Sequence, residues 1–475
     1  MLRSPVSGVG QMGVLKRARV ARRLFIATSA AVLLSACAAN HASTAPRAGT
    51  LSSLLSPVDQ SIAVPAVATP PKGKMTLAQV INNTIGNNPD IGIARSQLKD
   101  AQANVGIAQA PLLPSIDYNA AIGPEHTYAY DTEIGTNATR KEASIHASQL
   151  LFDFGKAFSD VDWAKSLKDS ASLRLEVKTE DILSSTIEAY LGVLELDMQI
   201  ANSQANVAAH QEMFRIVTLN EQGGNGTKAD AQKASTRLEA AKAQTLDLQA
   251  QRRTAASTFE RVTGWAPGSL QMPNPPPTRL GASDAEIARY AATNPQLLSF
   301  QKDKASLEYQ IRALTLDYLP KVTLDGTAKL QVNVSGVTPQ TADARAMLSV
   351  GGPLFDGGDR ISKIQQLQAR IEETQYRYQR AMDDLKFDLG DAGRVLQTAS
   401  AKLANIAGRI ASSEDVVKLY TQQFQGGTRT VFELLDAQQE LSSARSEQIT
   451  ARFDVLRAKY HMLRLTGALT AALTQ

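Results

Sequence analysis

Residues 321–334 alternate strictly between apolar and polar side chains. Even positions hold Val, Leu, Ala or Gly, and odd positions are polar throughout. The alternation resumes from Ala344 to Val350 and at Leu354. A period of two indicates strands with one apolar and one polar face. We predict strands at about 321–334 and 343–355. A soluble hairpin packing one face on a core is one interpretation, but the length also suits a tilted membrane strand of about 9–11 residues.

A period of seven runs through the region that follows. Starting at Ile364, every seventh residue up to Tyr420 belongs to one mostly apolar row, and a second row runs from Met382 to Phe424. Such a seam is typical of a long coiled helix. From Ile361 to Gln425 the helix would be about 100 Å long at 1.5 Å per residue. A dimeric coiled coil is the alternative, but it leaves the preceding strand pair unexplained.

The same landmarks occur twice along the chain. Two pairs are separated by 206 residues and three by 203. Constant offsets at five landmarks indicate a tandem duplication. The pairs are Asn88-Pro89 with Asn294-Pro295, Leu113-Pro114 with Leu319-Pro320, Leu151-Phe152-Asp153 with Leu354-Phe355-Asp356, Gly223-Gly224 with Gly426-Gly427, and Thr263-Gly264 with Thr466-Gly467.

Each repeat has one order of elements. A short helix, a longer helix ended by Leu-Pro, two strands, and a long helical hairpin turning at Gly-Gly follow one another. The expected first repeat is 75–264, with strands at about 115–130 and 140–152 and a hairpin at 156–263. A Pro-rich linker, 265–283, precedes the second repeat, 284–467, whose hairpin is 359–466; residues 468–475 form a tail.

Four amphipathic strands are too few to close a barrel in lipid. An open edge leaves backbone groups unsatisfied, and closed barrels usually need about eight strands. Several chains must therefore pool their strands, and three would supply about twelve. The predicted fold is a membrane β-barrel plus a long α-helical barrel: an internally duplicated, mostly α, trimeric channel with four strands per chain.

The N-terminal region has the layout of a secretory signal. Six basic residues and no acidic ones lie within 1–36, an apolar run of about a dozen residues follows the basic cluster, and Leu34-Ser35-Ala36-Cys37 resembles the bacterial lipobox. The resemblance implies cleavage of 1–36 and acylation of Cys37. Residues 37–74 would then be a lipidated tether. The translation start is Met1 or Met12, and a chance free cysteine is the alternative for Cys37.

The net charge, the cysteine and histidine content and the motifs argue against several classes of function. Without residues 1–36 the chain has 44 basic and 46 acidic side chains, so nothing suggests nucleic acid. Cys37 is the single cysteine, and the five histidines are scattered, so we expect no metal site. No catalytic or ATP-binding motif occurs. We therefore expect no enzyme activity and no cofactor other than a covalent lipid on Cys37.

The sequence resembles the TolC-like outer-membrane factors. The duplicated landmarks and the stretch from Gly427 to Gln438 carry the resemblance, which covers most of the mature chain. It implies a homotrimeric outer-membrane channel, lipid-anchored and extending into the periplasm. Its implied partners are a periplasmic adaptor, an inner-membrane transporter and outer-membrane lipid. Type I secretion and drug or small-molecule efflux both remain open.

The resemblance also implies a gate at the periplasmic helical tip. Carried over by position, the gating candidates are Asp230, Phe424, Arg429, Glu433 and Asp436. Solvated helix ends are the alternative for the charged ones. The tip turns Gly223, Gly224, Gly426 and Gly427 would meet the adaptor.

Two other classes of protein remain as alternatives. A lipid-anchored periplasmic adaptor also has a helical hairpin, but would not need two hairpins and two membrane-length strand pairs. A lipid-anchored enzyme is the third interpretation.

Overall fold

The computed structural model describes residues 73–129, 134–224, 226–275, 284–334, 340–467 and 469, all within one compact unit, 65–475. The expected signal peptide, the lipidation site Cys37 and nearly all of the tether lie outside the described residues. So do residues 276–283 of the expected linker and all of the tail except Leu469.

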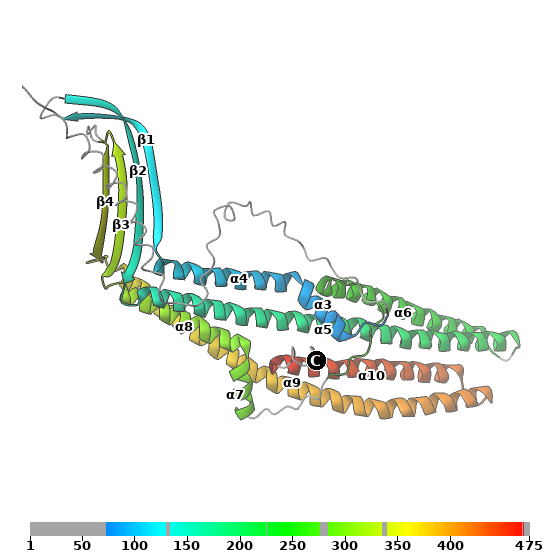
Figure 1. Cartoon of the computed structure of the whole chain (residues 1–475). Helices are drawn as coiled ribbons and strands as arrows, with labels where there is room; N and C mark the ends of the chain where they lie inside the picture. The colour runs from blue at the N-terminus through cyan, green and yellow to red at the C-terminus, as the bar shows by residue number, and fades with distance from the viewer. Residues whose placement is uncertain are drawn as a thin grey trace, which may run out of the picture. The chain divides into compact units, whose positions relative to one another are not determined.

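Four antiparallel strands form one sheet in the order β1-β2-β3-β4 (Figure 1). They are β1 (Ser115–Ala129), β2 (Ile134–Phe152), β3 (Lys321–Val332) and β4 (Thr341–Gly351). The expectation of four strands per chain is confirmed. β2 begins six residues before the expected position 140, since its pairing with β1 continues to Ile134. β4 ends at Gly351, close to Pro353, which has no N–H to donate to a ladder.

The register gives the sheet one apolar and one polar face. Ile145 pairs with Tyr118 on β1 and with Ala328 on β3, and Leu324 pairs with Leu348 on β4. Because paired residues share a face, these side chains form one continuous apolar surface. Tyr118 is 86% exposed and Leu348 63%, so the described part of this chain leaves that surface largely uncovered.

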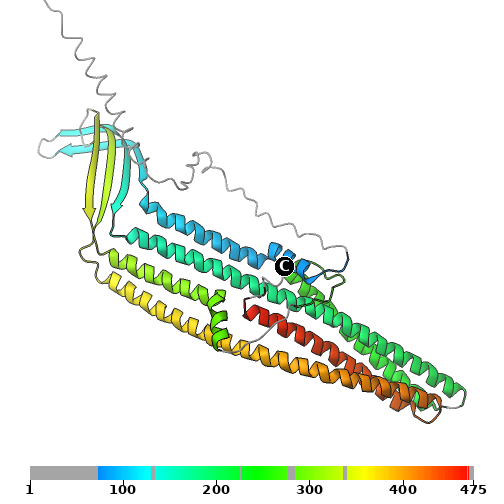
Figure 2. The same ribbon diagram turned by 60° about the horizontal axis from the view of Figure 1, so that its bottom comes forward.

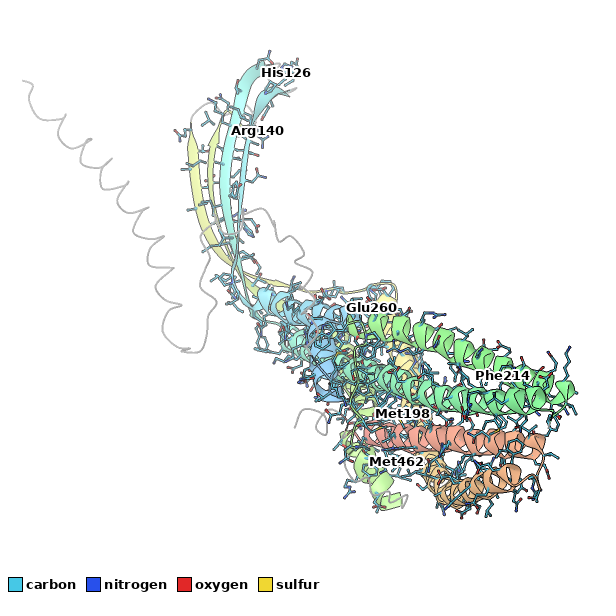
Figure 3. All side chains as sticks on the ribbon, turned by 90° about the vertical axis from the view of Figure 1, so that its right-hand side faces the viewer. His126, Arg140, Met198, Phe214, Glu260 and Met462 are labelled. Atoms are coloured by element: carbon cyan, nitrogen blue, oxygen red, sulfur yellow. The ribbon has the colours of Figure 1, made fainter. Side chains whose placement is uncertain are left out.

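The opposite face of the sheet is a network of polar side chains. The Asp325 carboxylate accepts hydrogen bonds from the Ser148 hydroxyl (2.7 Å) and the Thr323 hydroxyl (2.9 Å). Farther from the helices, Arg140 forms ion pairs with Glu125 (3.2 Å) and Glu142 (2.7 Å; Figure 3). The hydrogen-bonding groups on this face are polar or charged and pair with one another, so the face is suited to contact with water.

Two helical hairpins have matching lengths. The long helices α5 (Lys156–Gln222) and α9 (Asp359–Gln425) have 67 residues each, or about 100 Å. The return helices are α6 (Lys228–Thr263) and α10 (Val431–Leu465). The lead-in elements are α3 (Leu77–Asn87), α4 (Pro89–Gln109), the 3₁₀ turn η1 (Ala110–Leu112), α7 (Asp284–Thr293) and α8 (Pro295–Leu316).

The helices pack side by side (Figures 1 and 2). α5 contacts α4, α6, α8 and α10, and α9 contacts α8 and α10. In the predicted seam, all five residues of the first row from Leu385 to Ser413 are buried, which confirms the period of seven. Among the described helices, none combines the length and the apolar character of a membrane-spanning helix.

The largest core joins α3, α5, α6 and α10. Its fully buried aromatic side chains include Tyr190, Phe259 and Phe453. The Tyr190 hydroxyl lies 2.8 Å from the carbonyl oxygen of Met75 and 2.6 Å from that of Gln271. Trp265 and Leu270 also belong to this core. The beginning of the expected linker is therefore packed, because these two apolar side chains are removed from water.

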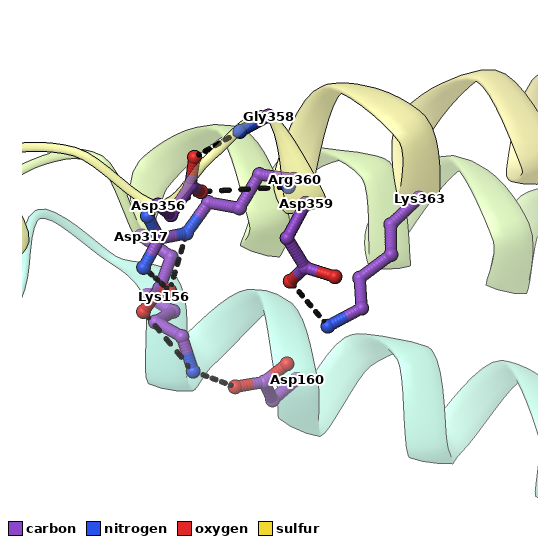
Figure 4. Close-up of polar contacts among 8 residues, drawn as sticks. All are labelled: Lys156, Asp160, Asp317, Asp356, Gly358, Asp359, Arg360 and Lys363. Carbon is purple, nitrogen blue, oxygen red and sulfur yellow. Dashed lines mark hydrogen bonds and ion pairs between the residues drawn. The ribbon is translucent and has the colours of Figure 1, made fainter.

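A network of charges ties the repeats together where the strands enter the helices (Figure 4). The N-cap residue of α9 is Gly358. The Asp356 carboxylate accepts a hydrogen bond from the backbone N–H of Gly358 (3.1 Å) and so helps to cap the start of the helix. Arg360, only 14% exposed, pairs with Asp356 (2.9 Å) and with Asp317 on the end of α8 (2.8 Å). Lys156 on α5 lies 3.9 Å from Asp317, so all three helices meet here.

Candidate functional site at the hairpin tips

Both hairpins reverse direction at glycine pairs. Gly224 (φ 79°) and Gly427 (φ 70°) adopt the left-handed conformation that other residues rarely tolerate. At the second turn, the N–H of Gly427 donates to Phe424 O (3.0 Å) and the N–H of Thr428 to Gln423 O (2.9 Å). This pattern is a Schellman motif, which satisfies the last carbonyl groups of α9. Gly223 and Gly426 take the preceding C-cap positions.

The return helices start with matching capping boxes. The hydroxyl of Thr227 donates to the Asp230 carboxylate (2.8 Å) and accepts from the backbone N–H of Asp230 (3.2 Å). Thr430 and Glu433 repeat this arrangement at the start of α10. Two of the five gating candidates, Asp230 and Glu433, therefore hold the first turn of a helix.

Arg429, in the second turn, contacts both helices that flank the turn, α9 and α10. Its guanidinium pairs with Glu433 on α10, donates to Gln423 on α9 (3.0 Å), and stacks 4.1 Å from the centre of the Tyr420 ring. The hydrogen bond from Arg429 keeps the pKa of the Glu433 carboxyl below its ordinary value. The same contact raises the pKa of the Arg429 guanidinium. The pair is therefore ionised throughout the physiological pH range.

One ion pair and one cation–π contact link the two hairpins near the tip. Asp436 on α10 pairs with Arg237 on α6 at 3.2 Å. The Lys233 ammonium lies 4.0 Å from the centre of the Phe432 ring, again between α6 and α10. Both contacts would break if the hairpins separated.

A small apolar cluster lies beneath these contacts. Val217 on α5, Ala234 on α6, and Val431 and Leu435 on α10 are buried in it. Phe424 is partly buried against the cluster, as is Phe214 near the same end of α5 (Figure 3). The ring of Phe424 therefore packs between hairpins and needs no hydroxyl partner there.

The structure places four of the five candidates near the turn of the second hairpin, where they make three separate contacts. Arg429 and Glu433 form a pair, Asp436 crosses to the first hairpin and Phe424 packs below, whereas Asp230 serves the start of α6. The other residues of the tip contacts were not predicted from the sequence; they are Arg237, Lys233, Phe432 and Tyr420. No local pattern identifies them, because their contacts join segments remote in sequence or depend on the turn geometry.

A family model described as outer membrane efflux protein matches residues 80–265 and 287–468. The chain belongs to this family. The two matched stretches carry one helical hairpin each. Membership confirms the prediction of an outer-membrane export channel and supports it over the alternative of a periplasmic adaptor.

Curated members of the outer membrane efflux protein family are similar along most of their length. Outer membrane efflux protein BepC of Brucella suis is 24% identical over 400 residues, covering 83% of this chain and 86% of the relative. Alkaline protease secretion protein AprF of Pseudomonas aeruginosa is 25% identical over 380 residues, covering 75% and 77%. Pyoverdine export outer membrane protein OpmQ of the same species is 23% identical, covering 78% and 81%.

Solved structures share the fold. The CmeC outer membrane channel of Campylobacter jejuni superposes with a TM-score of 0.72 at 16% identity, covering 83% of this chain and 86% of that one. The outer membrane protein VceC of Vibrio cholerae gives a TM-score of 0.69 at 18% identity, covering 84% and 96%. The fold class expected from the TolC-like resemblance is confirmed.

Proposed function

We propose that three copies of this chain form the outer-membrane channel of a tripartite export system. The channel passively conducts substrate, delivered by a periplasmic adaptor and an inner-membrane transporter, to the exterior. The observation that carries the proposal is the four-stranded sheet, which has an exposed apolar face and ends in β1 and β4.

The chemistry of the sheet favours assembly in lipid. Unpaired backbone groups at an edge cost several kcal/mol each in hydrocarbon. When β4 of one copy pairs with β1 of the next, three copies give twelve strands and remove every open edge. The apolar face then contacts lipid, and the polar face around Asp325 lines a water-filled passage.

The helices continue the passage on the periplasmic side. Four helices lie side by side at each level: α4, α5, α8 and α9 near the sheet, and α6, α5, α10 and α9 near the tips. Three copies would close these layers into a tube about 100 Å long. Cys37, carrying lipid, would anchor each chain to the membrane.

The tip contacts are our proposed gate. The pair between Asp436 and Arg237 holds the second hairpin against the first, and Phe424 fills the space beneath. Arg429 and Glu433 keep the second turn rigid, and Asp230 does the same for the start of α6. Opening separates the hairpins, and the glycine turns present the surface on which an adaptor docks.

The transport step needs no catalytic chemistry of its own. We propose that the chain is not an enzyme, binds no cofactor beyond its lipid, and takes energy from the partner transporter. The relatives include a protein named for protease secretion and one named for pyoverdine export, so protein secretion and small-molecule efflux both remain candidate uses.

Single-channel recording in planar bilayers tests the channel and its gate. The wild-type protein should insert pores of low conductance. Asp436→Asn should raise the conductance, because it removes the charge that pairs with Arg237. Glu221→Gln removes one charge near the first turn without touching that pair and should leave the conductance near wild type. Absence of any pore would overturn the channel, whereas equal effects of both variants would overturn the gate alone.

A further inference from the structure

A pocket of the described chain lies where the helices meet the sheet. It has a volume of about 1150 Å³ and is lined by α4, α5 and α8 together with the adjoining ends of the strands. Both repeats contribute to its walls. Small-molecule sites usually have volumes of about 300–1,000 Å³, so this pocket is large enough for such a ligand.

The strand residues in the wall show which side of the sheet the pocket occupies. Ser115, Ser148 and Thr323 line it. Ser115 pairs with Ser148, and Thr323 pairs with Leu150, another wall residue, so the wall belongs to the polar face. If the polar face surrounds the passage, as proposed above, the pocket opens into the passage and not toward lipid.

The walls combine apolar surface with an aromatic ring. Ile107, Leu113, Leu167, Leu316 and Trp163 contribute to them. Ile107 is 67% exposed and Leu113 65%, so large apolar side chains are accessible at the pocket. Such walls favour a ligand with a substantial apolar body, and the face of a tryptophan ring favours a cation.

The charges in the walls have a negative balance. Three carboxylates, those of Asp153, Asp160 and Asp317, stand against the ammonium groups of Lys156 and Lys321. Lys156 lies 3.1 Å from Asp160 and 3.9 Å from Asp317. The Asp153 carboxylate accepts two backbone N–H groups, at 3.0 and 2.7 Å, and joins no ion pair within the described ranges. Arg360, which does not line the pocket, also pairs with Asp317 (2.8 Å) and with Asp356 (2.9 Å). When Arg360 and Asp356 are included, four carboxylates stand against three cations, so each chain keeps an excess of one negative charge at the junction.

We propose that this junction pocket binds amphipathic organic cations within the passage, one site per protomer. The inference rests on the proposed function, because the passage places the polar face in water. The bound cation would lay its apolar body on the α4 and α8 side chains and its charge near Trp163 and the carboxylates. The site would hold substrate briefly between the helical tube and the barrel.

Tryptophan fluorescence provides a specific signal. The chain has two tryptophans, Trp163 in the pocket and Trp265, which is 6% exposed in the core. In the Trp265→Phe background, trimers in zwitterionic nanodiscs are titrated with tetraphenylphosphonium, and empty nanodiscs correct for lipid partitioning. Saturable quenching is expected. Tetraphenylborate has nearly the same shape and the opposite charge, and should bind about tenfold more weakly, the scale of one partly screened charge.

Two variants, one in η1 and one in α4, localise the effect. Ala110→Phe fills the pocket and should abolish quenching, whereas Ala103→Phe, on an exposed α4 position outside the lining, should leave it intact. Equal binding of both ions, or quenching that survives Ala110→Phe, would overturn the site. Conducting trimers that show no saturable quenching would refute the pocket proposal while the channel stands. Failure to form trimers or pores would refute the channel itself.

Discussion

Met347 and Leu348 offer a matched test of which sheet face meets lipid. They are adjacent on β4, and both are large and exposed, at 54% and 63%. The register places them on opposite faces, since Met347 pairs with Asp325 on the polar face and Leu348 pairs with Leu324 on the apolar face. An arginine at each position should therefore have very different effects.

The expected cost follows from depth in the bilayer. Leu348 lies two residues from Ala346, the centre of β4, which is about 5 Å of depth for a strand tilted near 45°. An arginine facing lipid costs about 2–4 kcal/mol at the midplane and less toward the interface, so we expect about 2 kcal/mol per chain for Leu348→Arg. The three copies of a trimer would lose about 6 kcal/mol. Met347→Arg points into water beside Asp325 and should change stability by less than about 0.5 kcal/mol.

Guanidinium unfolding of trimers in lipid vesicles, followed by gel mobility of unheated samples, measures the difference. Leu348→Arg should unfold at a markedly lower denaturant concentration than wild type, and Met347→Arg at a concentration close to it. Equal destabilisation by both variants, or greater destabilisation by Met347→Arg, would refute the assignment of faces.

Three further predictions concern the helical part. Glu180 is only 8% exposed, and its burial raises the pKa of its carboxyl group to about 7. Because the fold disfavours the charged form, the stability of the folded state falls as the pH rises from about 4 to 7. Glu180→Gln should therefore raise thermal stability at pH 8, by at most about 3 kcal/mol, and leave it unchanged at pH 4. Tyr190→Phe should cost about 1–3 kcal/mol in denaturant unfolding, because two buried carbonyl groups lose their hydroxyl contact. Arg360→Ala should lower Tm more than Lys363→Ala, whose ion pair is exposed.

The sequence predicted those features that repeat along it. The period of seven located the buried row from Leu385 to Ser413, and the period of two located β3 because its faces differ at every step. The weaker alternation in β2 concealed its first six residues. Polar Asn137 and Thr139 lie on the apolar face, yet backbone pairing with β1 continues to Ile134. Hydrogen-bonded ladders do not require a favourable side-chain pattern.

At the tips, local motifs and tertiary contacts differ in how far they could be foreseen. The capping boxes of Thr227 with Asp230 and Thr430 with Glu433 have a spacing that sequence inspection can detect. Asp436 and Arg237, by contrast, are 199 residues apart in the sequence. Their ion pair forms only because the two hairpins pack against each other. Only the structure could supply that contact.

The central claim is that one chain has too few strands to seal a pore and that three chains complete it. Native mass spectrometry of protein extracted from outer membranes, released from detergent in the gas phase, measures the number of chains directly. We predict an assembly of three protomers that requires detergent or lipid to stay in solution. A monomer that remains soluble without detergent after removal of any acyl group would contradict it.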